Sequence, residues 1–578
     1  NRKSKKIYED QTFVDDGYNG RPRRTTTSFA MSAEPAKIGD AFKRQPFRER
    51  VRDWNKSMTG KQGLPYLVHT IVVIKVVMYL FFFYYLLRDA NSSIFSELNA
   101  KRFLLYNVIG DVLGFNSTSG ALGARLRLPF VTWYNFLTPG TLTSPLLDIK
   151  AVRGVHHVVL FLAYVCALVR ALLCPTPPGF SEMAPPVALL LVLSLLDTTI
   201  FFASRGEHFG YMMVCMLFGG QQWLFGWQMC QAALWMGAGL AKVGPWFKWV
   251  TAQMTPNCVF LDLAPAALRT MLYKDAPNDF TPSKACEWLA RFGCCSEMLT
   301  PVLCVFCPAL GVPLAVGFHL YIFSQMPFAS VMEWNVLCMF NAVFLFHFHP
   351  VTVPPGLNPL LAVFLVVFLL LVPAAGQLYP KLVPFLMAFR PYAGNWRFSW
   401  MVVSKQAQDK VRALTTMDSL FMRENAPTSM RYDPDMCQQY EYIYTGNLML
   451  YPHFRPFLPI VEMLMEREGW GDNDFQEFFQ EMLLNATLGW CLGTGWHLRP
   501  RFFEALQSRC QFKPGECFFV IFEPQSPVTH VAEWKVMDLT DWNTPGKYVI
   551  HGKAPYAELE SFQPCDVPVS FVKSHSVL

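Results

Sequence analysis

Charge is scarce in this chain. Aspartate, glutamate, lysine and arginine together make up 16% of its 578 residues, whereas soluble domains are nearer ~25% charged. Apolar residues account for 52% of the sequence. A composition of this kind excludes an ordinary soluble globular protein and predicts a membrane protein.

The motifs of common soluble enzymes are missing as well. The chain has no Gly-x-Ser-x-Gly elbow, no P-loop and no His-Glu-x-x-His, each of which would indicate a specific chemistry. Its sixteen cysteines are scattered, and although Cys304 and Cys307 have the Cys-x-x-Cys spacing, no second pair of ligands stands at a zinc-binding distance. We therefore predict no metal site and assign these cysteines to apolar packing.

What the chain does contain is a series of apolar runs. The first, Leu67–Leu87, is interrupted only by His69 and Lys75 and reaches the length of about 20 residues that a membrane span needs. The later runs are Val155–Leu173, Val187–Ala203, Tyr211–Phe218, Trp227–Val243, Pro301–Leu310, Val312–Phe328, Val331–Phe346 and Leu357–Leu378. Several are too short alone, and breaks are expected at 219–222 and 311–313. We predict a polytopic helical membrane bundle of about eight or nine membrane elements.

Three domains are expected. Residues 1–66 form a basic N-terminal arm, residues 67–389 form the membrane domain with polar loops at 88–154 and 246–296, and residues 390–578 form a tail. The tail contains the helix-like stretches Phe457–Glu468 and Phe475–Leu484, then the strand-like runs Cys517–Phe522, Glu533–Leu539 and Lys547–Ile550. Because helices are followed by strands, the tail is predicted to be a soluble α+β domain. The fold class is mainly α.

The arm sets the expected orientation and partners. Short basic flanks stay on the cytoplasmic side of a membrane, so the N-terminus is expected on the cytosolic, stromal or matrix face. The arm's arginines and lysines suit lipid headgroups, with docking onto a partner protein as the alternative. Nucleic acid is not an expected partner, because the arm lacks interleaved aromatic residues. The residues do not distinguish the endoplasmic reticulum from an organellar membrane.

Lys242 is the strongest functional signal. It ends the apolar run Trp227–Val243, and a lysine in hydrocarbon costs about 2.5–3.5 kcal/mol on insertion scales, so it usually has a partner or a task. At 100° per residue, Gln228 and Gln231 fall on the same stripe of this helix within about 60°. His208 opens the preceding apolar run. These residues predict a polar site between membrane helices.

Other runs contribute further polar residues. Polar side chains at bilayer depth generally face the bundle interior and pair with one another. We expect the pocket around Lys242 and His208 to be lined by Gln228, Gln231, Lys75, Glu297, His319, Gln325 and Glu333. For any one of them the alternative is a structural role, such as an ion pair between Lys75 and either Asp197 or Glu333.

Several motifs resemble the membrane domain of the vitamin K-dependent carboxylase and of the horizontally transferred transmembrane superfamily that shares it. They are Gly206-Glu207-His208-Phe209-Gly210-Tyr211, Gly239-Leu240-Ala241-Lys242-Val243, Lys75, the stretch from Glu297 to Pro301, and Phe318-His319 followed by residues 324–328. The resemblance covers roughly residues 67–350. It implies that Lys242 acts as a base toward a bound hydroquinone and that His208 assists it. A quinone, hydroquinone or other isoprenoid lipid is the implied cofactor.

The chain also departs from the carboxylase. Ala241 stands where the carboxylase has a second lysine, and the carboxylase's large lumenal domain has no counterpart in the tail. These differences favour ligand binding over carboxylation of protein glutamate. A closer resemblance is to an uncharacterised family of multi-pass membrane proteins of similar length. It rests on 390–396, 493–498 and 510–516 and implies no chemistry.

Two other functions remain open, and the residues do not decide whether the protein is an enzyme. One is a non-catalytic accessory subunit or assembly factor of a larger membrane complex, bound through the arm and the tail. The other is a haem-binding redox protein. The candidate haem ligands are His156, His157, His208, His319, His347 and His349.

Overall fold

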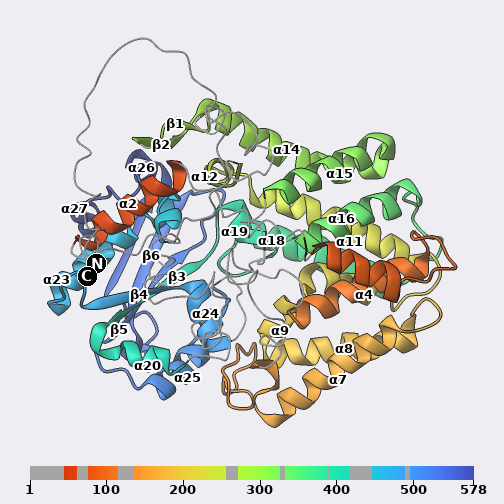
Figure 1. Ribbon diagram of the computed structural model, residues 1–578, viewed down its shortest axis with the longest axis horizontal. Coiled ribbons are helices and arrows are strands. Elements are labelled where there is room, and N and C mark those ends of the chain that lie inside the picture. Colours follow the sequence, from red (N-terminus) through yellow and green to blue (C-terminus); the bar gives the residue numbers. More distant parts are fainter. Residues whose placement is uncertain are drawn as a thin grey trace, which may run out of the picture. The chain divides into compact units, whose positions relative to one another are not determined.

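The structure is a computed structural model, shown in Figure 1. It describes residues 45–60, 74, 76–114, 135–255, 271–276, 278–325, 332–383, 385–386, 389–414, 445–488 and 495–577. All of them belong to one compact unit, residues 38–578. Lys75 and residues 1–44 of the predicted arm lie outside the described residues.

The first half of the described chain is helical. The helices are α4 (Glu97–Val112), α7 (Val155–Leu172), α8 (Phe180–Leu196), α9 (Thr198–Ala203), α10 (Tyr211–Cys215), α11 (Gln222–Ala241), α12 (Phe247–Met254), α14 (Lys284–Phe306), α15 (Pro308–Ser324), α16 (Met332–Ala342), α17 (Pro359–Val366) and α18 (Val372–Leu378). Short π-helical turns, η1 (Phe83–Leu87), η2 (Gly206–Gly210), η5 (Val343–His347) and η6 (Val367–Leu371), continue or join them. The prediction of a mainly helical protein is confirmed.

Three of the described helices are long and apolar enough to cross a bilayer. They are Val155–Leu172, Lys284–Phe306 and Pro359–Leu378. Shorter apolar helices cover Val76–Leu87, Phe180–Leu196 and Pro308–Ser324. The described residues thus support a membrane protein, while the predicted number of eight or nine membrane elements is not confirmed.

The break between α14 and α15 was predicted at the wrong place. The helices separate at Cys307, and Gly311 lies inside α15. A Cβ atom at Gly311 would lie 2.3 Å from the backbone nitrogen of Cys304. The glycine is therefore needed for close packing of α15 on α14 and does not end a helix.

The two predicted polar loops contain helices. Residues 88–154 include α4, and residues 246–296 include α12 and the first half of α14. Two buried charged side chains of α4 have partners: Lys101 pairs with the exposed Glu97 at 2.7 Å, and Asp111 pairs with Arg205 at 3.3 Å. Paired polar residues made this helix look like a surface segment in the sequence.

The tail is built on a six-stranded antiparallel sheet of order β4-β3-β5-β6-β7-β8. The strands are β3 (Phe398–Ser404), β4 (Phe475–Phe479), β5 (Cys517–Glu523), β6 (Val531–Asp538), β7 (Ile550–Pro555) and β8 (Ser576–Val577). A separate pair, β1 (Tyr273–Asp275) and β2 (Asp279–Pro282), precedes α14. Every residue of β3 and β5 is buried, so helices must cover both faces of the sheet.

The tail's elements alternate more than the sequence indicated. Helix α23 (Phe457–Glu468) and strands β5 and β6 are confirmed. The helix predicted over Phe475–Leu484 is wrong at its start, because Phe475–Phe479 pairs with β3 and only Gln480–Leu488 forms helix α24. The strand predicted at Lys547–Ile550 begins only at Ile550. Strand β3 was missed, since a short apolar run does not reveal its partner strands.

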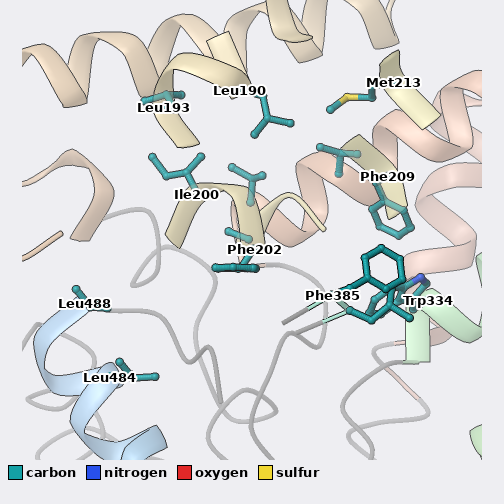
Figure 2. Packing of buried hydrophobic residues seen from close by; sticks show 14 of the residues in the cluster. Leu190, Leu193, Ile200, Phe202, Phe209, Met213, Trp334, Phe385, Leu484 and Leu488 are labelled. Atoms are coloured by element: carbon teal, nitrogen blue, oxygen red, sulfur yellow. The ribbon is translucent and has the colours of Figure 1, made fainter. Parts of the chain in front are cut away.

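Two sets of helices cover the sheet (Figure 1). One face packs against α2 (Phe47–Gly60), α23, α26 (Tyr556–Ser561) and α27 (Val569–Ser574). The other packs against α20 (Gln408–Arg412), α24 and α25 (Pro500–Cys510), and its apolar cluster continues into the helical bundle. Figure 2 shows part of this continuous cluster, from Leu190 and Leu193 of α8 to Leu484 and Leu488 of α24.

Helix α2 attaches the described end of the predicted arm to the tail. Arg48 binds both carboxylate oxygens of Glu462, at 2.7 and 2.6 Å. The Phe47 and Phe475 ring centroids lie 5.2 Å apart, and Arg52 pairs with Asp566 at 2.8 Å. These basic residues of the arm therefore bind acidic residues of the same chain.

We predict that the buried carboxyl group of Glu477 makes the stability of the folded protein depend on pH. It stands opposite Val402 on the edge strand β4, and burial raises its pKa to about 7, although nearby Arg50 opposes the shift. The folded state keeps this proton, so its contribution is complete below about pH 4.5 and is lost as the pH rises through 7, by roughly 3 kcal/mol. In Glu477→Gln, this loss should disappear when the free energy of unfolding is measured between pH 5 and 8.

The matched control is Glu466→Gln, because Glu466 is an exposed carboxylate that pairs with Lys573. It should keep the pH dependence of the wild-type protein. Equal pH profiles for wild type and Glu477→Gln would contradict the prediction.

Candidate functional site

A cavity of about 430 Å³ lies between helices α11, α12, α14, α15 and α16 and the chain segment 386–393. Its volume is within the range of small-molecule sites. The polar and charged residues among its described lining are Lys242, Thr251, Thr255, Ser296, Glu297, His319, Tyr321, Gln325, Asn335, Arg390 and Tyr392. The rest of the lining is largely apolar or aromatic, so polar groups meet the cavity at few points.

Lys242 and Glu297 form an ion pair in the cavity wall. Lys242 caps the C-terminal end of α11, and its ammonium group contacts the carboxylate of Glu297 on α14. Their side chains are only 11% and 5% exposed. A cation at a helix C-terminus is favourable. Removing one partner of an ion pair as buried as this one strongly destabilises the folded protein.

Small residues bring the two helices close enough for this pair. A Cβ atom at Gly239 would lie 2.6 Å from Cγ and 3.1 Å from the backbone nitrogen of Met298. Only glycine fits there without moving α14. Gly239 thus lets α11 and α14 pack closely, as small residues do between helices in membranes.

Two aromatic rings lie beside Lys242, and a second cation stands elsewhere in the described lining. The ammonium nitrogen of Lys242 lies 5.3 Å from the ring centroid of Phe247 and 5.8 Å from that of Phe318, within range of cation–π attraction. Arg390 is buried and donates to the carbonyl oxygens of Phe385 at 3.2 Å and Gly376 at 2.6 Å. The described lining therefore carries two cations and one carboxylate.

Gln325 adds a polar group with both donor and acceptor capacity. It caps α15, lines the cavity and is only 7% exposed. Among the described residues, none forms a hydrogen bond with its side-chain amide. A buried polar group of this kind normally needs a partner, and a ligand in the cavity would provide one.

His208 lies behind the cavity wall. The indole N–H of Trp334 donates to its Nδ1 at 2.7 Å, so Nε2 carries the proton and donates to Oε1 of Gln231 at 3.2 Å. Asn341 donates to the same oxygen at 2.8 Å. Trp334 lines the cavity, whereas His208 is not among the described lining residues.

His319 has a similar arrangement but lines the cavity. Its Nε2 accepts from the indole of Trp235 at 2.8 Å, and Nδ1 therefore donates to Oδ1 of Asn335 at 2.8 Å. Both nitrogens of His208 and of His319 are thus engaged. Axial ligation of haem by either histidine would break one of these hydrogen bonds.

The other predicted site residues have different surroundings. Gln228 donates to the carbonyl oxygens of Leu345 and His349, both at 2.8 Å, which ties α11 to the end of η5. Glu333 is buried on α16 and is not among the described lining residues. Asp197, an expected partner of Lys75, pairs with Arg153 at 2.8 Å. The cavity thus unites Lys242, Glu297, His319 and Gln325, while His208, Gln228, Gln231 and Glu333 lie outside its lining.

Sequence reasoning missed Arg390 and Trp334. Arg390 begins the stretch Arg390–Trp396, which was assigned to the tail on the basis of the predicted domain boundary. An arginine soon after the last long apolar run was the available signal. No sequence signal identified Trp334 as a site residue, because many tryptophans in a membrane protein serve packing alone.

The bundle, its apolar helices and its cavity define an integral membrane protein with a ligand-sized internal site. The chain belongs to the family described as a transmembrane protein of unknown function, DUF3556, which it matches over residues 28–542. The predicted membership of an uncharacterised membrane family is confirmed. No curated protein and no solved structure matches the chain. The link to the carboxylase is not shown and stays a hypothesis.

Proposed function

We propose that this protein binds an isoprenoid lipid of the quinone class, with its polar ring beside Lys242 and Glu297. The observation that carries the proposal is a buried ion pair facing a largely apolar cavity of about 430 Å³. Ligand sites are commonly apolar with a few placed polar groups. An amphipathic lipid matches that division.

The polar groups suit both redox states of a quinone. The ammonium group of Lys242 can donate to a quinone carbonyl, and the carboxylate of Glu297 can accept from a hydroquinone hydroxyl. Gln325 can do either at a second position. The rings of Phe247 and Phe318 flank the ion pair and offer flat apolar surfaces for a ring to stack on.

The geometry supports binding more directly than catalysis. The proposed base, Lys242, already contacts Glu297, and the proposed assistant, His208, has both ring nitrogens engaged. A catalytic role for these two residues stays a prediction. Binding depends only on the cavity and the polar groups at its wall.

Filling the cavity should remove the ligand. Gly293 lines it, and a Cβ atom there would meet only Cε1 of Phe247, at 3.7 Å, so Gly293→Leu projects its side chain into the space without displacing backbone. We expect protein carrying Gly293→Leu to contain at least about tenfold less bound isoprenoid than wild type, because the leucine side chain occupies the space of the ligand. Mass spectrometry of lipids extracted from protein purified in native membrane discs measures this.

The control for that measurement is Gly219→Leu. Gly219 lies outside the cavity lining, and a Cβ atom there meets nothing within 4 Å. It should retain the wild-type amount of lipid. The proposal would be wrong if wild type carried no isoprenoid, or if both leucine variants carried as much as wild type.

A further inference from the structure

The cavity has an opening on the outer surface of the bundle. Four of its described lining residues are exposed: Phe292 on α14 and Pro313, Gly317 and Tyr321 on α15. The rest of the described lining is buried or half-buried. These four residues are where the cavity lining reaches the outer surface, and we call them its mouth. They lie on α14 and α15, which lie side by side (Figure 1).

The surface around this mouth is largely apolar, although Arg291, next to Phe292, is exposed with its guanidinium 5.3 Å from the ring centroid of Trp288. Helix α14 is one of the candidate membrane spans. Its exposed apolar residues are Trp288, Phe292, Leu299, Val302 and Phe306, and those of α15 include Leu310 and Leu320. On α14 these residues follow helical spacing along one face. Such a stripe on a membrane helix is typical of contact with lipid, so the mouth opens toward hydrocarbon.

The charged groups of the described lining are in the cavity wall, and the four mouth residues carry no charge. Lys242, Glu297 and Arg390 are buried in the wall, whereas Phe292 is 68% exposed at the mouth. At one edge of the mouth, the hydroxyl oxygens of Thr255 and Tyr321 lie 3.1 Å apart and join the end of α12 to α15. A bound amphipathic molecule would place its polar group inward and its apolar part outward.

We infer that the ligand is a long-tailed lipid that enters sideways from the bilayer and leaves its tail in the mouth between α14 and α15. This inference rests on the proposed function, which assigns the ring to the cavity. A cavity of about 430 Å³ suits one compact group, since sites of a few hundred cubic ångströms enclose a drug-sized molecule. A polyisoprenoid tail therefore extends beyond it, and tail length is not limited by the protein.

Two probes with the same ring but tails of different length distinguish binding of the ring in the cavity from passage of the tail through the mouth. One is a benzoquinone with a single isoprene unit, and the other carries ten units. Their affinities are measured in lipid discs by quenching of tryptophan fluorescence. We expect wild type to bind both probes.

The test variant is Phe292→Glu and its matched control is Trp288→Glu. The two residues are one helical turn apart and equally exposed, at 68%, but only Phe292 lines the cavity. A carboxylate at the mouth should weaken binding of the long probe at least about tenfold relative to the short one, because an apolar tail must pass a charge. Trp288→Glu should leave the ratio of the two affinities unchanged.

Gly317→Phe is the second variant, in case a charge on α14 impairs insertion. A Cβ atom at Gly317 meets nothing within 4 Å, so the ring narrows the mouth without displacing backbone. It should also weaken the long probe selectively. If neither Phe292→Glu nor Gly317→Phe changes the ratio, the tail does not pass this mouth and the inference is overturned. If wild type binds neither probe, the quinone proposal itself fails.

Discussion

Glu297→Ala should destabilise the protein by about 3–5 kcal/mol, the usual loss when a buried ion pair is left with one charge. The ammonium group of Lys242 would then remain only 11% exposed without its counter-charge. Lys242→Ala should have a similar effect for the same reason. The free energy of unfolding in mixed micelles measures both changes.

The double variant Lys242→Met/Glu297→Met separates structure from ligand binding. Replacing both charges by apolar groups of similar length is often close to neutral for stability. We therefore expect the double variant to regain most of the stability that Glu297→Ala loses. It should still lose the bound isoprenoid, because the charged donor and acceptor that we propose bind the ring are gone and the Gln325 amide alone remains at a second position.

An exposed ion pair provides the comparison. Lys573 and Glu466 lie 2.8 Å apart in the tail with side chains 43% and 70% exposed, and Glu466→Ala should change stability by no more than about 1 kcal/mol. If Glu297→Ala were equally mild, the pair would be solvated and its role in the cavity would be lost. If the double variant kept the wild-type lipid, the pair would be a structural lock alone.

Arg455→Met should lower the free energy of unfolding by about 4 kcal/mol or more, at least as much as Glu297→Ala. The reason is that several buried carbonyl oxygens would lose their hydrogen-bond donor. Arg455 is fully buried, and burial lowers its pKa to about 10, so it is charged at neutral pH. Its guanidinium donates to the carbonyl oxygens of Met449, Leu450, Leu559, Glu560 and Phe562. One side chain thus joins two segments of the tail, residues 449–455 and 559–562.

The same guanidinium also reaches the helix that lines the cavity. It lies 4.6 Å from the ring centroid of Trp249 on α12, while other residues of α12 face the cavity. In Arg455→Met we therefore expect faster hydrogen exchange in both α12 and the 559–562 segment. Mass spectrometry of deuterium uptake measures this directly.

Arg467→Met is the control, since Arg467 pairs with neighbouring Glu468 and its side chain is 52% exposed. The free energy of unfolding of the Arg467→Met variant should remain within about 0.5 kcal/mol of that of wild type. Unchanged hydrogen exchange in α12 of Arg455→Met would show that the guanidinium does not hold this helix against the tail.

Local sequence pattern was sufficient for some elements. Helix α23 was predicted at its observed bounds because its apolar periodicity and the following Gly469 agree. The edge strand Phe475–Phe479 was mistaken for helix, since its backbone is held by pairing with Phe398–Ser404, about 75 residues earlier in the chain. No window of local sequence contains that partner.

The site shows the same division. A lysine at the end of an apolar run implies a partner, and Glu297 was among the residues expected near Lys242. The sequence did not show that these two side chains touch, because the close approach depends on Gly239 packing against α14. It also did not show that Trp334 stands between His208 and the cavity.

Composition and the long apolar runs determined by themselves that this is a helical membrane protein with a polar tail, because burying so much apolar surface requires lipid around the helices. They also identified Lys242 as a residue in need of a partner. Which side chains meet at one cavity was decided only by the tertiary structure. Helix–helix distance and sheet pairing join residues far apart in the chain, and no local pattern records those distances.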